Sequence, residues 1–396
     1  MTRYPSANSK LTLPMAITIG IKAIVGVGLF TAPSALQVVA GPAGILTYVL
    51  VSAAALCMAL AIARLAQLYP EKGVFYTYTK AWGGHFWGTV ATSSYMIGLI
   101  IALGLLAYVA GGIYLHAYVP SISPAALSVA LIALVVGAHL AGAEIAKTGQ
   151  KVLLVLTYIP ILLIILLCLF KADVANLTPF FPHGWTSVFT AVPYVIFGFF
   201  GFEAIPSLFN DIENPERNVP KAIVWTMIIV GLTYILFAGS IFLGLPRHFF
   251  VSARTPLSAA LLPLYPQLTW LVACIDWTII IAIVGVLHAM IWSLSSLAID
   301  TSEYILRRSS HVSKKAALLL IGGSVMLSCL LFNNAIDLMF LLTAIFITLA
   351  QGLSMLALIL QPRGRSSYQI AIACMGICVS LLIFGCALAG VVQALG

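Results

Sequence analysis

The chain has 396 residues, of which 62% are hydrophobic and only 8% are charged. Soluble domains carry about 25% charged residues, so this composition excludes a water-exposed surface around one core. The formal charge of +8 would suit a nucleic-acid-binding protein, but the long apolar runs between the charges exclude that class and leave a membrane protein. All seven Cys lie inside apolar runs, which predicts buried thiols rather than a disulfide framework.

Eleven apolar runs are long enough to cross a bilayer, taking about 20 residues for each crossing. They begin near Leu13, Gly44, Gly88, Pro124, Val152, Ser187, Ile223, Leu268, Ala316, Ile336 and Tyr368. We therefore expect an all-α polytopic membrane protein, with a single transmembrane domain over residues 1–396. The first run is long, carries Lys22 and leads directly into the second, so we expect it to be retained rather than cleaved as a signal peptide.

The loop charges predict the orientation. Fifteen Lys and Arg residues fall on the side of the N-terminus, and only Lys171, Arg247 and Arg254 fall on the other side. The positive-inside rule then predicts a cytoplasmic N-terminus, and the odd number of spans predicts a C-terminus outside. We expect a multi-pass protein of the plasma membrane, specifically a bacterial inner membrane.

Glycines interrupt two of the expected helices. The first span contains Gly20, Gly26 and Gly28, and the sixth contains Gly198 and Gly201. Each Gly weakens a helix by about 1 kcal/mol relative to Ala, so these groups predict local breaks. Glycines also occur in membrane helices for close packing, which is the alternative interpretation.

The positions of the interruptions favour the breaks. The first and sixth spans open two successive groups of five, a pattern typical of transporters built from inverted repeats, whose substrate site lies at the broken helices. We expect the first repeat over residues 13–171, the second over 187–361 and an extra helix over 368–396. A broken helix presents unpaired N–H groups at one end and unpaired C=O groups at the other, and a zwitterion needs both.

Three motifs carry a family resemblance: "AIVGVGLFTAPS" at 23–34, "LYPEKGVFYTYTKAWG" at 68–83 and "GFFGFEAIPSLFNDIENPERNVPKAI" at 198–223. Through them the chain resembles the amino acid/polyamine/organocation (APC) superfamily of amino-acid permeases, over about residues 13–360. The resemblance implies the five-plus-five inverted-repeat fold (APC/LeuT-like) with broken helices 1 and 6, alternating access and amino-acid transport. The family often has Ser where this chain has Val27, and it usually has twelve helices.

The expected substrate site surrounds the two breaks. It comprises Ile24, Gly26, Val27, Gly28, Phe197, Gly198, Phe199, Gly201 and Phe202, with Met96, His288, Met290 and Trp292 as further candidates. The phenylalanines could form an aromatic wall or could face lipid. Because no acidic side chain lies between Ser187 and Phe202, the site favours a neutral or apolar amino acid, although carbonyls and aromatic faces also bind cationic substrates.

Two charges fall within the spans near the breaks. Lys22 precedes Gly26 by four residues and so shares its helical face, and Glu203 follows Gly201 in a helix of opposite direction. An unpaired charge at this depth is costly, so we expect Lys22 and Glu203 to meet as a titratable coupling or gating element. The alternative is that Lys22 extends its long side chain to the cytoplasmic face.

Several classes are excluded or remain open. No His, Cys or carboxylate cluster has metal-ligand spacing, and no nucleophile and base pair is visible, so we expect no metal, no cofactor and no enzyme. Asp276 and His139 are interpreted as structural.

The favoured function is that of a secondary amino-acid transporter, working by proton symport or by exchange. An exporter or antiporter of cationic amino acids or polyamines, and a membrane sensor that binds an amino acid without moving it, remain. Expected partners are an amino acid, protons and membrane lipid, with the chain as a monomer or homodimer and no nucleic acid.

Overall fold

The protein is described here by a computed structural model that covers residues 10–70, 74–142, 147–209, 212–252, 255–306, 313–333, 335–361 and 366–395. Several predicted loop cations, among them Arg3, Lys72, Arg254, Arg307 and Arg363, lie outside these ranges. Between the described residues the only β-structure is an isolated bridge from Leu11 to Ile212. The other regular elements of the described residues are helices.

The helices follow the predicted runs closely. In chain order they are α1 (Leu13–Ile24), α2 (Val27–Val39), η1 (Gly41–Ala43), α3 (Gly44–Leu68), α4 (Val74–Ala107), η2 (Tyr108–Leu115), α5 (Pro124–Leu140), α6 (Lys147–Phe170), η3 (Val174–Leu177), α7 (Ser187–Thr190), α8 (Val192–Phe197), α9 (Ala204–Ser207), α10 (Pro215–Gly244), η5 (Arg247–Phe249), α11 (Leu257–Leu261), η6 (Leu262–Leu264), η7 (Pro266–Leu268), α12 (Thr269–Leu306), α13 (Lys314–Leu331), α14 (Ile336–Met355), α15 (Ala357–Leu360) and α16 (Ser367–Leu395).

Length and composition identify the membrane-crossing helices. Within the described residues, seven helical segments are long and apolar enough to cross a membrane, and the bent pair α1 and α2 makes an eighth. Three shorter apolar helices, at 124–140, 154–170 and 187–197, lie where the fourth, fifth and sixth spans are predicted. The helical multi-pass fold is therefore confirmed, while the count of eleven spans and the repeat boundaries stay predictions.

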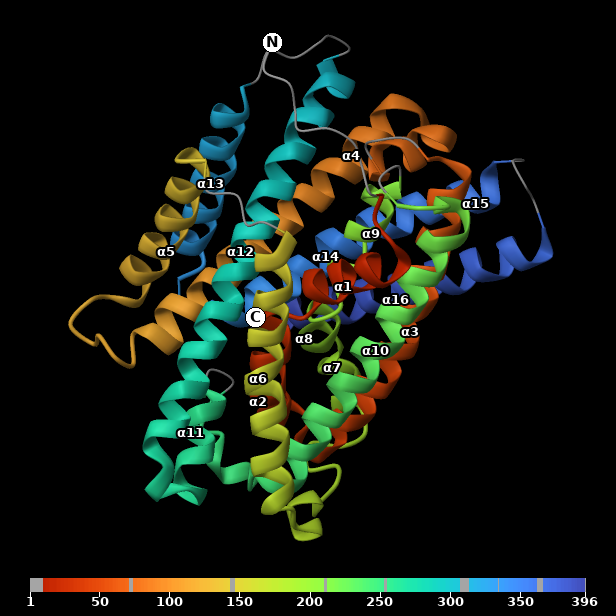
Figure 1. Cartoon of the computed structure of the whole chain (residues 1–396). Coiled ribbons are helices and arrows are strands. Elements are labelled where there is room, and N and C mark those ends of the chain that lie inside the picture. The colour runs from red at the N-terminus through yellow and green to blue at the C-terminus, as the bar shows by residue number, and fades with distance from the viewer. Residues whose placement is uncertain are drawn as a thin grey trace.

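Short helices occupy the middle of the bundle. Figure 1 shows α1, α8 and α9 near the centre of the view, between the long helices α10 and α12. Contacts support this arrangement, because α1 packs against α9, α10 and α12, and α2 packs against α8. The two interrupted spans are thus enclosed by continuous helices.

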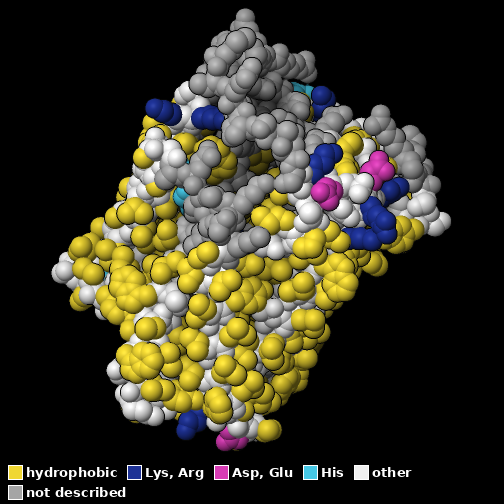
Figure 2. Space-filling view, in the orientation of Figure 1, with side chains coloured by type: hydrophobic (Ala, Val, Ile, Leu, Met, Phe, Trp, Pro, Cys, Tyr) yellow, Lys and Arg dark blue, Asp and Glu magenta, His cyan; other side chains and the backbone are white. Residues whose placement is uncertain are grey.

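The surface matches a membrane protein. In Figure 2 hydrophobic side chains cover most of the visible face, whereas Lys, Arg, Asp and Glu gather mainly at its upper end. Apolar side chains on a lipid-facing surface are stabilised by the bilayer and need no polar cover. Which side of the membrane holds the N-terminus stays a prediction.

Polar contacts tie the continuous helices together. On α4, Trp82 Nε1 donates to Leu353 O at 2.9 Å and Ser94 Oγ donates to Phe346 O at 2.7 Å, both on α14. Membrane helices lack a hydrophobic driving force for association, so such bonds and close packing hold them together. α4 bends at Gly84, where φ is +70°, and α14 packs against both α4 and α8. α14 therefore links α4 to the second broken helix.

Candidate functional site

The first break lies between α1 and α2. Val25 has φ −73° and ψ 98°, and Gly26 has φ −146° and ψ −146°, so the backbone is extended at both residues before α2 begins at Val27. The two helical pieces are bent by 44°. Leu29 N donates to Gly26 O at 3.3 Å, while the amides of Val27 and Gly28 stand at the start of α2, where no preceding turn supplies an acceptor. Gly26 and Gly28 are buried, and the side chain of Val27 lies outside the described part.

The second break follows α8. From Gly198 to Glu203 the chain runs in turns, with Gly198 N donating to Val195 O at 3.0 Å and Ala204 N to Gly201 O at 3.0 Å. Gly201 has φ +120°, a conformation that residues with a Cβ rarely adopt. Both predicted breaks are therefore confirmed.

The two breaks touch each other through glycine. A Cβ built on Gly28 would lie 2.5 Å from Gly198 Cα, and one built on Gly201 would lie 2.4 Å from Ala23 O. Neither distance leaves room for a side chain, so backbone meets backbone at both points. The structure thus places Gly28 beside Gly198 and Gly201 beside Ala23, while substrate binding at these residues stays a prediction.

Tyr234 of α10 links both broken helices, and the sequence analysis missed it. Its Oη lies 2.8 Å from Gly198 O and 3.2 Å from Ile24 O, and the side chain is fully buried. The phenol has a single proton, which two carbonyl groups, one from each break, share. The sequence feature that could have indicated Tyr234 is a tyrosine inside an apolar span, because a buried tyrosine usually has a hydrogen-bond partner.

Glu203 is held by the second break and by α14. Its Oε2 accepts from Gly201 N at 2.8 Å and its Oε1 accepts from Gln351 Nε2 at 2.6 Å. Glu203 is 3% exposed and Gln351 is fully buried. The carboxylate thus joins the broken helix to the supporting helix α14. Gln351 is a second residue that the sequence analysis missed. A single amide side chain in an apolar span is the sequence feature that could have indicated it.

Lys22 is also buried, at 8% exposed, in the last turn of α1. This burial argues against a side chain that reaches the aqueous surface in this conformation. The expected approach of Lys22 to Glu203 stays a prediction.

The phenylalanines of the second break point to different helices. Phe197 packs edge-on against Phe340 of α14 at 4.9 Å, whereas Phe199 packs against Tyr234 of α10 at 5.0 Å. Both are buried, as is Phe202, so these rings face protein rather than lipid. Phe197 also contacts the space beside Gly28, where a Cβ would meet its ring at 3.1 Å.

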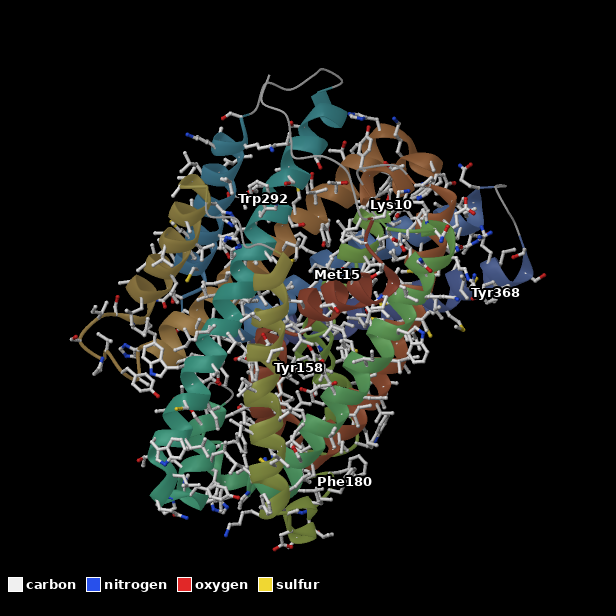
Figure 3. The ribbon with its side chains drawn as sticks, in the orientation of Figure 1. Lys10, Met15, Tyr158, Phe180, Trp292 and Tyr368 are labelled. Carbon is white, nitrogen blue, oxygen red and sulfur yellow. The ribbon has the colours of Figure 1, made fainter. Side chains whose placement is uncertain are left out.

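The further candidates on α12 belong to another cluster. His288 stacks on His139 of α5 at 3.9 Å, and His139 stacks on Trp292 at 5.6 Å. Lys314 Nζ lies 5.8 Å from the Trp292 ring centre. Figure 3 shows Trp292 in the upper part of the view, above the place where Figure 1 shows α8. Met96 and Met290 are partly buried and pack against the core.

No metal centre accompanies these residues. Among the described residues there is no group of three or more His, Cys, Asp and Glu that could hold a metal ion. The groups available at the breaks are amides, carbonyls, one phenol, one carboxylate and one amide side chain. These groups can bind a small polar molecule and exchange a proton.

Two interrupted helices that pack against each other and are enclosed by long helices are typical of the inverted-repeat transporter fold among multi-pass membrane proteins. The chain belongs to the amino acid permease family, whose sequence profile matches residues 11–395.

Relatives of known name agree with that family. The branched-chain amino acid permease BcaP of Bacillus subtilis is 24% identical over 69% of this chain and 63% of its own length. The cationic amino acid transporter 1 of Arabidopsis thaliana is 24% identical over 74% of this chain and 50% of its own length. The chain therefore matches only about half to two thirds of these proteins.

Solved structures share the fold. MhsT in complex with L-phenylalanine superposes with a TM-score of 0.67 at 16% identity, covering 94% of this chain and 98% of MhsT. A manganese transporter of Eremococcus coleocola superposes with a TM-score of 0.60 at 11% identity, covering 98% and 90%. At these identities the likeness concerns the fold alone.

Proposed function

We propose that this protein carries amino acids across a membrane by alternating access, through a substrate site at its two helix breaks. The observation that carries the proposal is the contact between Gly28 and Gly198, which brings the first amides of α2 beside the turns after α8. Amides at the start of a helix bind a carboxylate, and carbonyl groups at helix ends bind an ammonium group. One place in the bundle thus suits both charged ends of an amino acid.

A neutral or apolar amino acid fits this site best. Phe197 and Phe199 are buried at the second break, and Val286 of α12 is the side chain nearest to Gly26. Phe197 and Val286 are the apolar side chains beside Gly28 and Gly26, where a substrate side chain would lie, whereas Phe199 packs on Tyr234. The name of the Bacillus relative, a branched-chain amino acid permease, agrees with this class.

Exchange or export of cationic amino acids or polyamines is a second candidate. The Arabidopsis relatives named cationic amino acid transporters favour it. Carbonyl groups and aromatic faces can bind a cationic side chain without an acidic residue. Uptake measured across a panel of neutral and cationic substrates distinguishes the two candidates.

Reconstituted protein tests the proposal. Proteoliposomes are given labelled leucine, phenylalanine, lysine or putrescine, with and without a pH gradient and with and without internal unlabelled substrate. We expect leucine or phenylalanine to enter above the level of protein-free liposomes. Preferred uptake of lysine or putrescine would support the second candidate. Saturable binding of leucine without movement under any gradient would contradict transport and identify a sensor.

Glu203 and Gln351 provide the element that we propose for proton coupling. An ionised Glu203 accepts from Gln351 Nε2, as observed. A protonated Glu203 could instead donate its proton to Gln351 Oε1, which has no partner among the described residues. The amide can turn by 180° to present either atom, so it serves both protonation states of the carboxyl group. Each state would hold α14 to the second break through a different bond.

Glu203→Gln should remove the response of uptake to a pH gradient while keeping exchange of internal for external substrate. The substituted amide resembles a protonated carboxyl group and can still bond to Gln351, so the fold is retained. The measurement compares gradient-driven uptake with counterflow in the same proteoliposomes. Gradient-driven uptake equal to that of the unsubstituted protein would contradict the role in coupling.

Lys22→Met tests the partner proposed for Glu203. The substitution keeps a long, unbranched side chain and removes the charge, so packing in the last turn of α1 should change little. We expect the pH profile of uptake to shift relative to the unsubstituted protein. An unchanged profile would show that Lys22 does not take part in coupling, and Lys10→Met, at the exposed start of the described chain, is the matched control.

A further inference from the structure

A buried carboxyl group lies near the beginning of α12, apart from the residues assigned to the two breaks. Asp276 is 7% exposed, and its Oδ2 accepts from Tyr118 Oη at 2.8 Å. Tyr118 lies in the connection between η2 and α5, and its ring packs on Trp277 at 5.4 Å. Ser258 of α11 also forms a hydrogen bond to this carboxyl group. Three separate elements thus converge on one acidic side chain.

One buried carboxylate oxygen at this place lacks a partner. Within the part of the chain that the structure describes, Asp276 Oδ1 has no hydrogen-bond partner, whereas the Tyr114 phenol interacts with the Leu257 backbone. Tyr114 is 2% exposed and lies close enough to Asp276 for the carboxylate to act on its phenol electrostatically. A buried carboxylate oxygen is nearly always paired, so Asp276 Oδ1 can accept a further ligand.

The chemistry of these atoms favours a positively charged ligand. Tyr118 is 40% exposed, but partial desolvation and then the bond to Asp276 raise the pKa of its phenol, which keeps its proton and donates it to the carboxylate. A hydroxyl group that donates its proton still has lone pairs to offer. The cluster therefore presents one carboxylate oxygen together with hydroxyl oxygens, which are the ligands that hard cations prefer. A single carboxylate balances a single positive charge.

We propose that Asp276, Tyr114, Tyr118 and Ser258 form a binding site for a monovalent cation, either a sodium ion or the ammonium group of an amine. The site is separate from the proposed substrate site. α11 packs against both α12 and α2, so a cation held here would fix α11 beside the second half of the broken first span. Occupancy would then influence the freedom of α2 to move.

Binding of radioactive sodium to the purified full chain tests the site without any transport step. The protein is titrated with 22Na⁺, and choline chloride keeps the ionic strength constant because its quaternary ammonium group has no N–H to donate to the carboxylate. We expect saturable binding that Asp276→Asn weakens by about tenfold or more, since the substitution removes the only charge of the site. Asp337→Asn is the matched control, because Asp337 also accepts from a tyrosine, Tyr194, but is exposed.

A second arm separates the two ligands. If 22Na⁺ does not bind, methylammonium should raise the melting temperature of the unsubstituted protein, and this shift should disappear in Asp276→Asn. Tyr114→Phe, which removes one hydroxyl and no charge, should weaken the same binding even if Asp276→Asn does not fold. The proposal is overturned if neither cation binds saturably, or if Tyr114→Phe leaves the affinity unchanged. Neither result bears on amino-acid uptake, which proteoliposomes measure separately.

Discussion

Gly201→Ala should abolish most uptake and lower the free energy of unfolding by about 2 kcal/mol or more. Gly201 has φ +120°, where an alanine is strained, and the new methyl group would lie 2.4 Å from Ala23 O. The obstacle is a backbone carbonyl of α1 and not a flexible side chain, so the two broken helices would have to separate. Because the proposed site depends on their contact, substrate binding should be lost with it. Initial uptake rates and thermal unfolding in detergent measure the two effects.

Gly323→Ala is the matched control. Gly323 lies inside α13, and a Cβ there would have nothing within 4 Å. In a helix interior the change from Gly to Ala is neutral or stabilising by up to about 1 kcal/mol. Uptake should be unaffected. If Gly201→Ala behaved like Gly323→Ala in both measurements, the close contact between the two breaks would be wrong.

The helix breaks could be predicted because their cause is local. Glycine weakens a helix wherever it stands, and the groups around Gly26 and Gly201 recur in the first and sixth spans. The structure places the breaks at Val25 to Gly26 and at Gly198 to Glu203, within the predicted motifs. Hydropathy similarly located the long helices, because a bilayer imposes a nearly fixed length on each span.

The partners across the breaks could not be predicted, because their contacts depend on how distant helices pack. Tyr234 reaches Ile24 across 210 positions of sequence, and Gln351 reaches Glu203 across 148. A helix that is apolar on every side gives no periodic signal for the face that turns inward. An isolated polar residue in such a helix indicates that a buried hydrogen bond is present, but not which residue is the partner.

The candidates on α12 also show that sequence does not reveal which residues pack together. His288 and Trp292 were grouped with the breaks because polar and aromatic residues inside spans are typical of functional sites. In the structure they stack with His139 of α5. The position of a residue along a span is available from sequence, but the direction of its side chain around the helix is decided by packing.

The breaks also explain why continuous helices surround them. Within a bilayer, irregular backbone is tolerated only where protein or water satisfies its polar groups. Tyr234 from α10 supplies a hydroxyl to both breaks, and Gln351 from α14 bonds to the Glu203 carboxylate that accepts from Gly201 N. α10 and α14 thus stabilise the two breaks by hydrogen bonds as well as by packing. A change of conformation at the breaks must replace these hydrogen bonds with others. Substitutions that remove a single hydrogen-bonding atom test this requirement.

Tyr234→Phe should lower the free energy of unfolding by about 1–3 kcal/mol, the cost of buried polar groups that lose their partner. The substitution removes only the hydroxyl that lies between Ile24 O and Gly198 O. Packing of the ring against Phe199 and Tyr48 is retained, so the effect does not come from a cavity. We expect the initial uptake rate to fall as well, because the geometry of both breaks depends on this one donor.

Tyr368→Phe provides the comparison, since Tyr368 is 65% exposed on α16 and its hydroxyl lies outside the core. This variant should keep both the melting temperature and the uptake rate of the unsubstituted protein. A Tyr234→Phe protein that matched it would mean that the carbonyl groups of the breaks find other donors. A loss of uptake without loss of stability would instead indicate that the hydroxyl acts during the transport cycle, when the two breaks move relative to α10.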